Sequence, residues 1–255
     1  MKVVILAGGM GTRLAEETIT RPKPLVEIGG RPIIWHIMKH YAHYGFKEFV
    51  VALGYKGEMI KRYFQDYFSM NGSVTISLAD GKTRVHDTVK EDWNVHLVET
   101  GLYTTTGGRI KKLAPWVDEE AFMLTYGDGV CNVDIAKLVQ FHRQNGKLVT
   151  VTAVRPPARF GSLNFTDGGL ITEFVEKPLS GEGWINGGFF VVQRAALDYI
   201  KDDVPWESEP LRNIAADGEL VAYRHDAFWQ CMDTYRELKI LENYWESGEA
   251  PWKIW

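Results

Sequence analysis

Short runs of β-branched and apolar residues alternate with longer amphipathic stretches over most of the chain, and this alternation restricts the fold more than any other feature. The short runs have the length of buried strands and cover residues 3–7, 48–53, 94–100, 121–126, 149–154 and 187–192. Helical periodicity lies between these runs and after the last of them, at residues 32–44, 57–68, 133–144, 194–200, 211–216 and 234–245. This order predicts an α/β fold with a mostly parallel central sheet flanked by helices.

Length and composition predict how the chain is divided. It has 255 residues, of which 45% are hydrophobic and 24% charged, as is typical of a globular protein with a buried core. Prolines and glycines are scattered at the ends of elements and form no linker, so we predict a single domain over residues 1–255. Residues Asp80–Trp93 are polar and lack periodicity. They favour a mobile loop, or an excursion toward another subunit of a homo-oligomer.

Charge, cysteine content and the N-terminal sequence exclude several classes of protein. A formal net charge of -4 argues against a general nucleic-acid binder. The apolar run at residues 3–7 is too short for a signal sequence or a membrane span. Cys131 and Cys231 lack the spacing of a disulfide framework or a structural zinc site. We therefore expect a cytoplasmic protein that binds small molecules and has no nucleic-acid or membrane partner.

The first strand is followed by a glycine-rich loop, Gly8-Gly9-Met10-Gly11-Thr12-Arg13-Leu14. Glycines allow the backbone to approach a phosphate closely, although the loop has neither the Lys-Ser/Thr pair of a Walker A sequence nor the GxGxxG order of a dinucleotide fold. An ordinary glycine-rich turn is the alternative. Arg13 lies within the loop, and Lys23 lies between two prolines that restrict its backbone. Glycines followed by fixed cations predict a site for a polyanion such as a nucleoside triphosphate.

Acidic residues near two other predicted element ends suggest a metal site. Asp128 follows the expected strand 121–126, where carboxyl ends of parallel strands gather ligands, so it is well placed to bind Mg²⁺. Taken alone, Gly127-Asp128-Gly129 also fits an ordinary turn. Asp233 precedes the last long helix and is a second candidate ligand, but an N-cap role explains it equally. The sequence by itself does not bring the two carboxylates together.

Polar residues also lie at the end of one later strand and at the start of the next. Glu176 and Lys177 follow the expected strand Ile171–Val175, and Asn186 enters the next strand beside small glycines. A lysine can pair with a sugar phosphate, while a carboxylate and an amide can bind hydroxyl groups. A solvated hairpin is the alternative.

Three histidines, His36, His40 and His43, share one stripe of the predicted helix 32–44. The pair at i and i+4 is compatible with zinc, but no cysteine lies nearby in the sequence. Ile34, Ile37, Met38 and Tyr41 define the expected buried face, so we expect the histidines on a flank, in a surface or subunit contact.

Taken together, these segments resemble the sugar-1-phosphate nucleotidylyltransferase family over nearly the whole chain. The segments that carry the resemblance are LAGGMGTRLAEET (6–18), KPLVEIGGRPIIWHIM (23–38), WNVHLVETG (93–101), TGGRIKK (106–112), TYGDGV (125–130), INGGFFV (185–191) and FWQCMDT (228–234). The resemblance implies a Rossmann-like nucleotidyltransferase domain that uses Mg²⁺. It further implies transfer of a cytidylyl group from CTP to α-D-glucose 1-phosphate, giving CDP-glucose and pyrophosphate for deoxysugar and O-antigen synthesis.

The resemblance also assigns roles to individual residues. The implied catalytic residues are Arg13, Lys23, Asp128 and Lys177, and the implied metal ligands are Asp128 and Asp233. Nucleotide binding is implied for Leu6, Ala7, Gly8, Gly9, Met10, Gly11, Thr12, Arg13, Lys23, Thr104 and Arg109. Sugar-phosphate binding is implied for Tyr126, Gly127, Glu176, Lys177, Asn186 and Gly187. Cys231 departs from the family pattern, in which we expect proline, and this departure bears on the rigidity of Asp233.

Base selection and catalysis each leave alternatives open. Cytosine presents two adjacent acceptors and arginine only donates, so Arg109 at that edge favours cytosine over thymine and uracil. The alternative is that Arg109 is a solvated helix residue. A uridylyl- or thymidylyltransferase with the same mechanism and a different base is one alternative. A non-catalytic sensor of nucleotide or sugar phosphate is another, and it should have lost a phosphate-binding cation or a metal carboxylate. The presence of every expected cation and carboxylate favours turnover.

Overall fold

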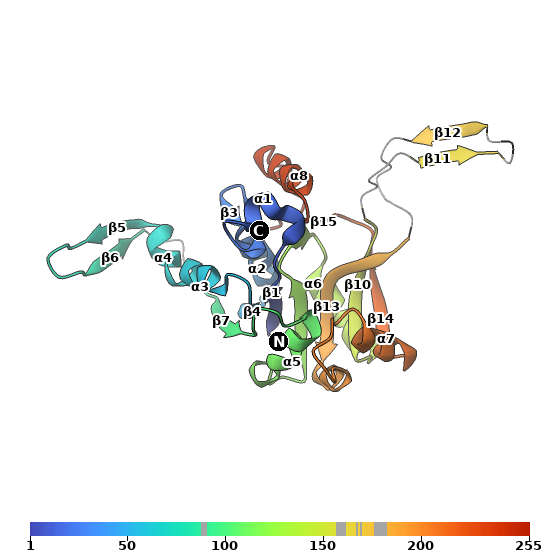
Figure 1. Cartoon of the computed structure of the whole chain (residues 1–255), viewed down its shortest axis with the longest axis horizontal. Coiled ribbons are helices and arrows are strands. Elements are labelled where there is room, and N and C mark those ends of the chain that lie inside the picture. Colours follow the sequence, from blue (N-terminus) through green and yellow to red (C-terminus); the bar gives the residue numbers. More distant parts are fainter. Residues whose placement is uncertain (88–90, 157–161, 167, 169, 176–182) are drawn as a thin grey trace.

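A seven-stranded sheet organises the molecule in the computed structural model, which describes residues 1–87, 91–156, 162–166, 168, 170–175 and 183–255 (Figure 1). The strand order is β14 (Leu220–His225), β10 (Val149–Val154), β13 (Ile185–Gln193), β8 (Ala121–Tyr126), β1 (Val3–Ala7), β4 (Glu48–Leu53) and β7 (Asn94–Glu99). Only β13 runs antiparallel to its neighbours in this sheet. The predicted α/β fold with a mostly parallel central sheet is confirmed.

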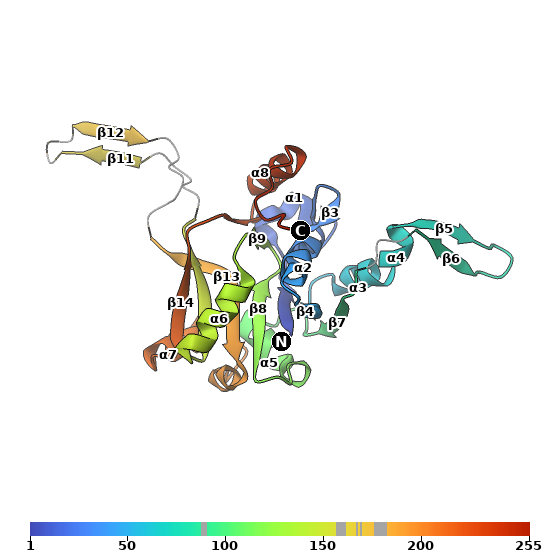
Figure 2. The same ribbon diagram turned by 180° about the vertical axis from the view of Figure 1, so that it is seen from behind.

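Helices cover both faces of the sheet (Figures 1 and 2). The α-helices are α1 (Ala15–Thr18), α2 (Ile33–His43), α3 (Gly57–Gln65), α4 (Tyr67–Met70), α5 (Thr106–Lys112), α6 (Ile135–Asn145), α7 (Glu209–Ala216) and α8 (Tyr235–Glu246). The 3₁₀ helices are η1 (Thr12–Leu14), η2 (Lys23–Leu25), η3 (Ala114–Trp116) and η4 (Arg194–Tyr199). Among the described residues, no helix is both long enough and apolar enough to cross a membrane.

Side chains of β1 point alternately into two apolar cores, because successive residues of a strand face opposite sides of the sheet. Val3 and Ile5 pack with helices α2, α6 and α8, whereas Val4 and Leu6 pack with α5, η4 and α7. The strand is buried on both faces, which explains its unbroken apolar sequence.

The described residues also form four two-stranded ribbons. They are β2 (Glu27–Ile28) with β3 (Arg31–Pro32), β5 (Ser73–Ile76) with β6 (Thr83–His86), β9 (Gly129–Cys131) with β15 (Trp229–Cys231), and β11 (Ser162–Phe165) with β12 (Ile171–Val175). The ribbons β5–β6 and β11–β12 project from opposite sides of the body (Figures 1 and 2).

Several predicted elements differ from those observed. Part of the expected loop Asp80–Trp93 is strand β6, because Thr83–His86 pair with Ser73–Ile76. The single helix expected over 57–68 is divided between α3 and α4 at Asp66. The α-helix expected over 194–200 is instead the 3₁₀ helix η4, which ends at Tyr199. Helix α5 and the edge strand β14 lie outside every predicted element.

Candidate active site

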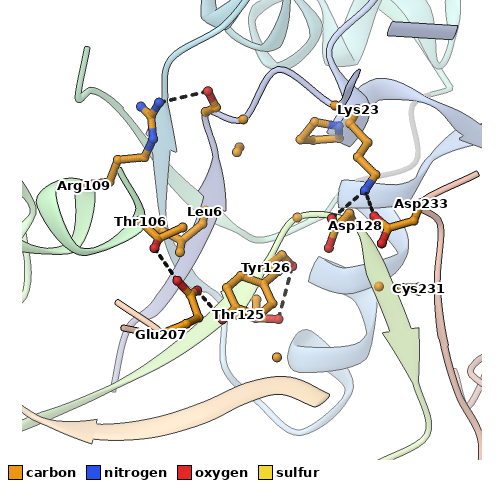
Figure 3. A pocket seen from close by; sticks show the side chains of 18 of the residues that line it. Leu6, Lys23, Thr106, Arg109, Thr125, Tyr126, Asp128, Glu207, Cys231 and Asp233 are labelled. Atoms are coloured by element: carbon orange, nitrogen blue, oxygen red, sulfur yellow. Dashed lines mark hydrogen bonds and ion pairs between the residues drawn. The ribbon is translucent and has the colours of Figure 1, made fainter. Parts of the chain in front are cut away.

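A pocket of about 660 Å³ lies where β1 and β8 end (Figure 3). Because β13 runs in the opposite direction, its first residues lie at the same edge of the sheet. Apart from Met10, every predicted site residue that the structure describes lines this pocket. Those residues are Leu6, Ala7, Gly8, Gly9, Gly11, Thr12, Arg13, Lys23, Thr104, Arg109, Tyr126, Gly127, Asp128, Asn186, Gly187 and Asp233. Glu176 and Lys177 lie outside the described residues.

The glycine-rich loop follows β1 and forms one wall of the pocket. Gly9 is exposed, and a Cβ placed there would meet nothing within 4 Å, so this part of the loop is open to a ligand. Gly11 has a φ of 63°, in the left-handed region that favours glycine. A Cβ at Gly11 would also lie 2.8 Å from Cγ2 of Thr18. The two glycines therefore serve different purposes, one leaving space and the other allowing the turn.

Arg109 lies behind the loop and is only 4% exposed, so the alternative of a solvated residue is wrong. Its terminal nitrogens donate to main-chain oxygens at the ends of three segments, Gly8 (2.9 Å), Leu53 (3.0 Å) and Gly101 (2.7 Å). Further bonds reach the hydroxyl of Thr100 and the carbonyl of Leu102. In this arrangement the guanidinium joins the glycine loop to the ends of β4 and β7. Burial lowers the pKa of Arg109 from its ordinary value.

Lys23 and the two predicted metal ligands meet in the pocket (Figure 3). The Lys23 ammonium donates to Asp128 Oδ2 at 2.7 Å and to Asp233 Oδ1 at 2.5 Å. Arg13, which is largely exposed, places a guanidinium nitrogen 2.6 Å from Asp233 Oδ2. Burial lowers the pKa of Lys23, but the carboxylates of Asp128 and Asp233 outweigh burial and leave this pKa above its ordinary value.

The carboxylate of Asp233 is available because another residue caps the following helix. Thr234 is the N-cap of α8 and forms a capping box with Glu237, so the N-cap alternative for Asp233 is wrong. Residues on both sides of Cys231 are fixed by backbone bonds. Strand β15 pairs with β9, and the amide of Met232 donates to the Asp128 carbonyl at 2.8 Å. The pairing of these strands thus holds the two aspartates side by side without the expected proline.

The donor set at this point fits a divalent cation. Two carboxylates converge on the position of one ammonium group, and carboxylate oxygens are ligands that Mg²⁺ prefers. No group of three or more histidine, cysteine, aspartate or glutamate residues suited to a metal occurs in the described part of the chain. A divalent ion held by Asp128 and Asp233 therefore needs further ligands from substrate phosphates and water, as is common for Mg²⁺.

The histidines predicted at the surface are mostly buried, so that expectation is wrong. His36 is fully buried and His40 is 3% exposed, while His43 is exposed. The helix is buried over a wider arc than its aliphatic residues indicate, because the C-terminal residues Trp245 and Trp252 pack on His36. His36 and His40 each bond to a backbone carbonyl, which is a packing role.

Sequence reasoning did not identify one acidic residue of the pocket. Glu207 lines the pocket and contacts Tyr126 and Thr106 (Figure 3). It lies in an irregular segment between η4 and α7, without a glycine motif or periodicity to mark it. In the sequence, Glu207 is marked only by its position directly after a tryptophan, Trp206, which is buried in the structure.

A glycine loop facing two carboxylates across the carboxyl edge of a parallel sheet is typical of proteins that bind a nucleotide together with a divalent ion. Comparison with known proteins makes this class more specific. Residues 2–234 match the family model for nucleotidyl transferases, and the chain belongs to that family.

Relatives match over the full length of the chain. The chain is 52% identical to the glucose-1-phosphate cytidylyltransferase of Salmonella typhi and 45% identical to the probable glucose-1-phosphate cytidylyltransferase of Bacillus subtilis, with 100% of each chain covered in both cases. The fold is similar to the crystal structure of HddC from Yersinia pseudotuberculosis, with a TM-score of 0.68 and 23% identity. That likeness covers 96% of this chain and 99% of HddC and supports the fold alone.

Proposed function

We propose that the protein transfers a cytidylyl group from CTP to α-D-glucose 1-phosphate, forming CDP-glucose and pyrophosphate. The observation that carries this proposal is the convergence of the glycine loop, Lys23 and two aspartates in one pocket. The full-length similarity to glucose-1-phosphate cytidylyltransferases supports the choice of substrates.

The reaction requires two anions to meet. A phosphate oxygen of glucose 1-phosphate attacks the α-phosphorus of CTP in line, a new P–O bond forms, and the bond to the leaving pyrophosphate breaks. The attacking oxygen is already ionised at neutral pH, so no general base is needed. Positioning contributes about 7–11 kcal/mol in favourable cases, and cations offset the repulsion between the phosphates.

The chain supplies these cations from the glycine-loop side of the pocket. Gly8, Gly9 and Gly11 leave space for the triphosphate, and Lys23 and Arg13 neutralise its charge. Both cations are bonded to carboxylates in the structure. Substrate binding therefore exchanges these carboxylates for phosphate oxygens. Lys177, which lies outside the described residues, orients the sugar phosphate in this proposal.

Members of the nucleotidyltransferase family generally use a divalent metal, and we propose Mg²⁺, with Asp128 and Asp233 as its protein ligands. When bound, the ion adds positive charge beside the reacting phosphates. Lys23 occupies the space between the two carboxylates, so its ammonium must move toward the phosphates for both aspartates to hold the ion.

Base selection by Arg109 remains a prediction. Its terminal nitrogens donate to the chain itself, so an approach to the cytosine edge requires some of these bonds to be exchanged. A donor opposite N3 and O2 of cytosine favours CTP over UTP and dTTP by about 1–3 kcal/mol.

One assay tests the reaction and the base together. Purified protein is incubated with Mg²⁺, glucose 1-phosphate and, separately, CTP, UTP, dTTP, ATP or GTP, and pyrophosphate release is measured. We expect release with CTP that depends on the sugar phosphate, and loss of release when EDTA removes the metal. A preference for UTP or dTTP would assign a different base. Absence of release with all five nucleotides would favour a non-catalytic sensor.

We also propose that the protein is a homo-oligomer in the cytoplasm. The ribbon β5–β6 projects from the body (Figure 1). Its exposed apolar residues include Ile76 at the end of β5 (57%) and Leu78 in the turn that follows (95%). Exposed apolar residues on a projecting ribbon favour contact with a second copy of the chain. Both cysteines are free thiols, which fits a reducing compartment.

Sedimentation tests the homo-oligomer. Leu78→Ser with Ile76→Ser should shift the protein toward monomer, because both changes remove apolar area from the β5–β6 ribbon. Leu170→Ser is the matched control, since Leu170 is a similarly exposed residue of the other projecting ribbon. A monomeric wild-type protein at micromolar concentration would contradict the proposal.

A further inference from the structure

The segment before α7 is fastened to the start of α5. Trp206 is fully buried, and its amide donates to Thr106 Oγ1 at 2.8 Å. One oxygen of Asp203, Oδ1, accepts from the amide and the hydroxyl of Thr105, at 2.9 and 2.6 Å. These bonds hold residues 203–206 at the rim of the pocket and place the next residue, Glu207, in its wall.

Two glycines of α5 make this contact possible. A Cβ at Gly107 would lie 2.3 Å from the Val204 carbonyl oxygen, and one at Gly108 would lie 2.0 Å from Asp203 Oδ1. Contacts this short leave no room for a side chain at either position. The position of Glu207 is therefore determined by close packing of two segments far apart in the sequence.

The carboxylate of Glu207 accepts hydrogen bonds from two elements (Figure 3). The hydroxyl of Thr106, in α5, donates to Oε2 at 2.7 Å. The hydroxyl of Tyr126, at the end of β8, donates to Oε1. Because an ionised carboxylate only accepts, both hydroxyl protons must point toward Glu207.

The direction of the Tyr126 hydroxyl in turn determines how Asn186 is oriented on the other side of the pocket. The proton of the Tyr126 hydroxyl is committed to Glu207, so the Tyr126 oxygen accepts from Asn186 Nδ2 at 3.1 Å. The other end of that amide, Oδ1, accepts from the Gly188 amide at 2.8 Å. Both ends of the Asn186 side chain are thereby oriented. Burial and the Glu207 charge raise the pKa of Tyr126, so its hydroxyl keeps its proton at neutral pH.

We propose that Glu207 is a positioning residue for the sugar subsite, which orients Asn186 through the Tyr126 hydroxyl. The inference rests on the proposed function, because it takes the Asn186 side of the pocket as the place where the hexose phosphate binds. Glu207 acts on the hexose through these two residues and not on the nucleotide phosphates, which the glycine loop and Lys23 receive.

Glu207→Gln tests this role at nearly constant volume. Only the oxygen of the amide accepts, so one of the two hydroxyls loses its acceptor, and the negative charge that commits the Tyr126 proton to this position is removed. We expect the KM for glucose 1-phosphate to rise about tenfold, the KM for CTP to change less than about twofold, and the melting temperature to stay unchanged. Glu209→Gln is the control, because Glu209 is also exposed and lies near Glu207 but does not line the pocket.

Tyr126→Phe provides an independent test if Glu207→Gln does not fold. It removes the hydroxyl between Glu207 and Asn186, and we expect a similar rise in the KM for glucose 1-phosphate alone. The double variant should have a KM for glucose 1-phosphate no more than about twofold above that of the more impaired single variant, because both changes break the same chain of hydrogen bonds.

Two results would overturn the positioning role while leaving the proposed function intact. They are an active Glu207→Gln enzyme with both KM values unchanged, and one in which both KM values rise in parallel. A wild-type protein without nucleotidyl transfer would instead remove the proposed function, because the comparison of KM values presupposes that activity.

Discussion

Lys23 and His36 are both basic side chains removed from solvent, but they are buried in opposite ways. Lys23 is 8% exposed and meets two carboxylates, which raise its pKa against the effect of burial. His36 is fully buried among aromatic rings, and burial lowers its pKa to about 4. The pocket therefore stabilises the charged form of Lys23, whereas the core beneath α2 favours the neutral form of His36.

The hydrogen bonds of His36 agree with a neutral ring. Its Nε2 lies 2.9 Å from the Ile28 carbonyl, and its Nδ1 accepts from the indole of Trp252 at 3.3 Å. Nδ1 cannot accept from Trp252 and carry a proton at the same time. The difference between the regions shows that burial of a titratable group does not by itself mark a functional site. Convergence of opposite charges on an open cavity is the stronger sign.

The largest expected effect concerns the charged pocket. Asp128→Asn should lower kcat by about a thousandfold or more, equivalent to about 4 kcal/mol, because it removes a proposed metal ligand. The fold should persist, since Lys23 keeps its contact with Asp233. Pyrophosphate release and circular dichroism measure the two effects.

Asp118→Asn is the matched control for that variant. Asp118 is an exposed carboxylate paired with Lys2, outside the pocket. Its substitution should leave turnover unchanged. Near wild-type turnover in Asp128→Asn would remove Asp128 from the proposed mechanism.

The second effect concerns the neutral core. Burial lowers the pKa of both His36 and His40 to about 4, below the ordinary 6.5. The unfolded chain therefore takes up protons first, so stability is complete above pH 6.5 and is lost as the pH falls toward 4. The loss should reach about 3 kcal/mol for each histidine by pH 4. Urea denaturation across this pH range measures it.

Replacing the exposed His43 with Gln provides the control for the acid experiment. His43 is at the surface and lowers the pKa of His40 only through its charge, in second place to burial, so its removal should leave most of the loss of stability between pH 6.5 and 4 in place. A free energy of unfolding that is constant over this range would show that the core histidines do not behave as described.

The smallest expected effect separates two neighbouring glycines. A Cβ at Gly8 would lie 2.3 Å from Cζ of the tightly bonded Arg109, so Gly8→Ala should destabilise the fold by about 1–3 kcal/mol. Gly9 has open space in front of it, so Gly9→Ala should keep the stability but raise the KM for CTP, because the methyl group enters the pocket. Urea denaturation and KM measurements distinguish the two. Equal stability losses in both variants would contradict this division.

Much of the fold could be predicted from local sequence. Strands β1, β4, β8 and β10 occur at their predicted residues, because strands buried on both faces are rich in apolar and β-branched residues. Helix α5 could not be found in this way, since Gly107 and Gly108 weaken its helical signal and are explained only by contact with residues 203 and 204. Strand β14 is a half-exposed edge strand that contains Arg224 and His225.

The site was predictable where a motif carries its own chemistry. The glycine loop, Lys23 and Asp128 each follow or accompany a recognisable element end, and the structure brings them to one pocket. The position of Asp233 beside Asp128 depends on the pairing of β15 with β9, which no local sequence pattern shows. Glu207 and the packing role of Arg109 depend on tertiary contacts, so sequence spacing gave no sign of either.

The reversed direction of β13 has a consequence for how this molecule tolerates change. Val154, the last residue of β10, pairs with Ile185, the first residue of β13. The connection between these two residues thus begins and ends at the same place, on the edge of the sheet that carries the pocket. Its length does not affect the pairing of the strands. A connection of another length in this position would therefore leave the pairing of β10 with β13 in register.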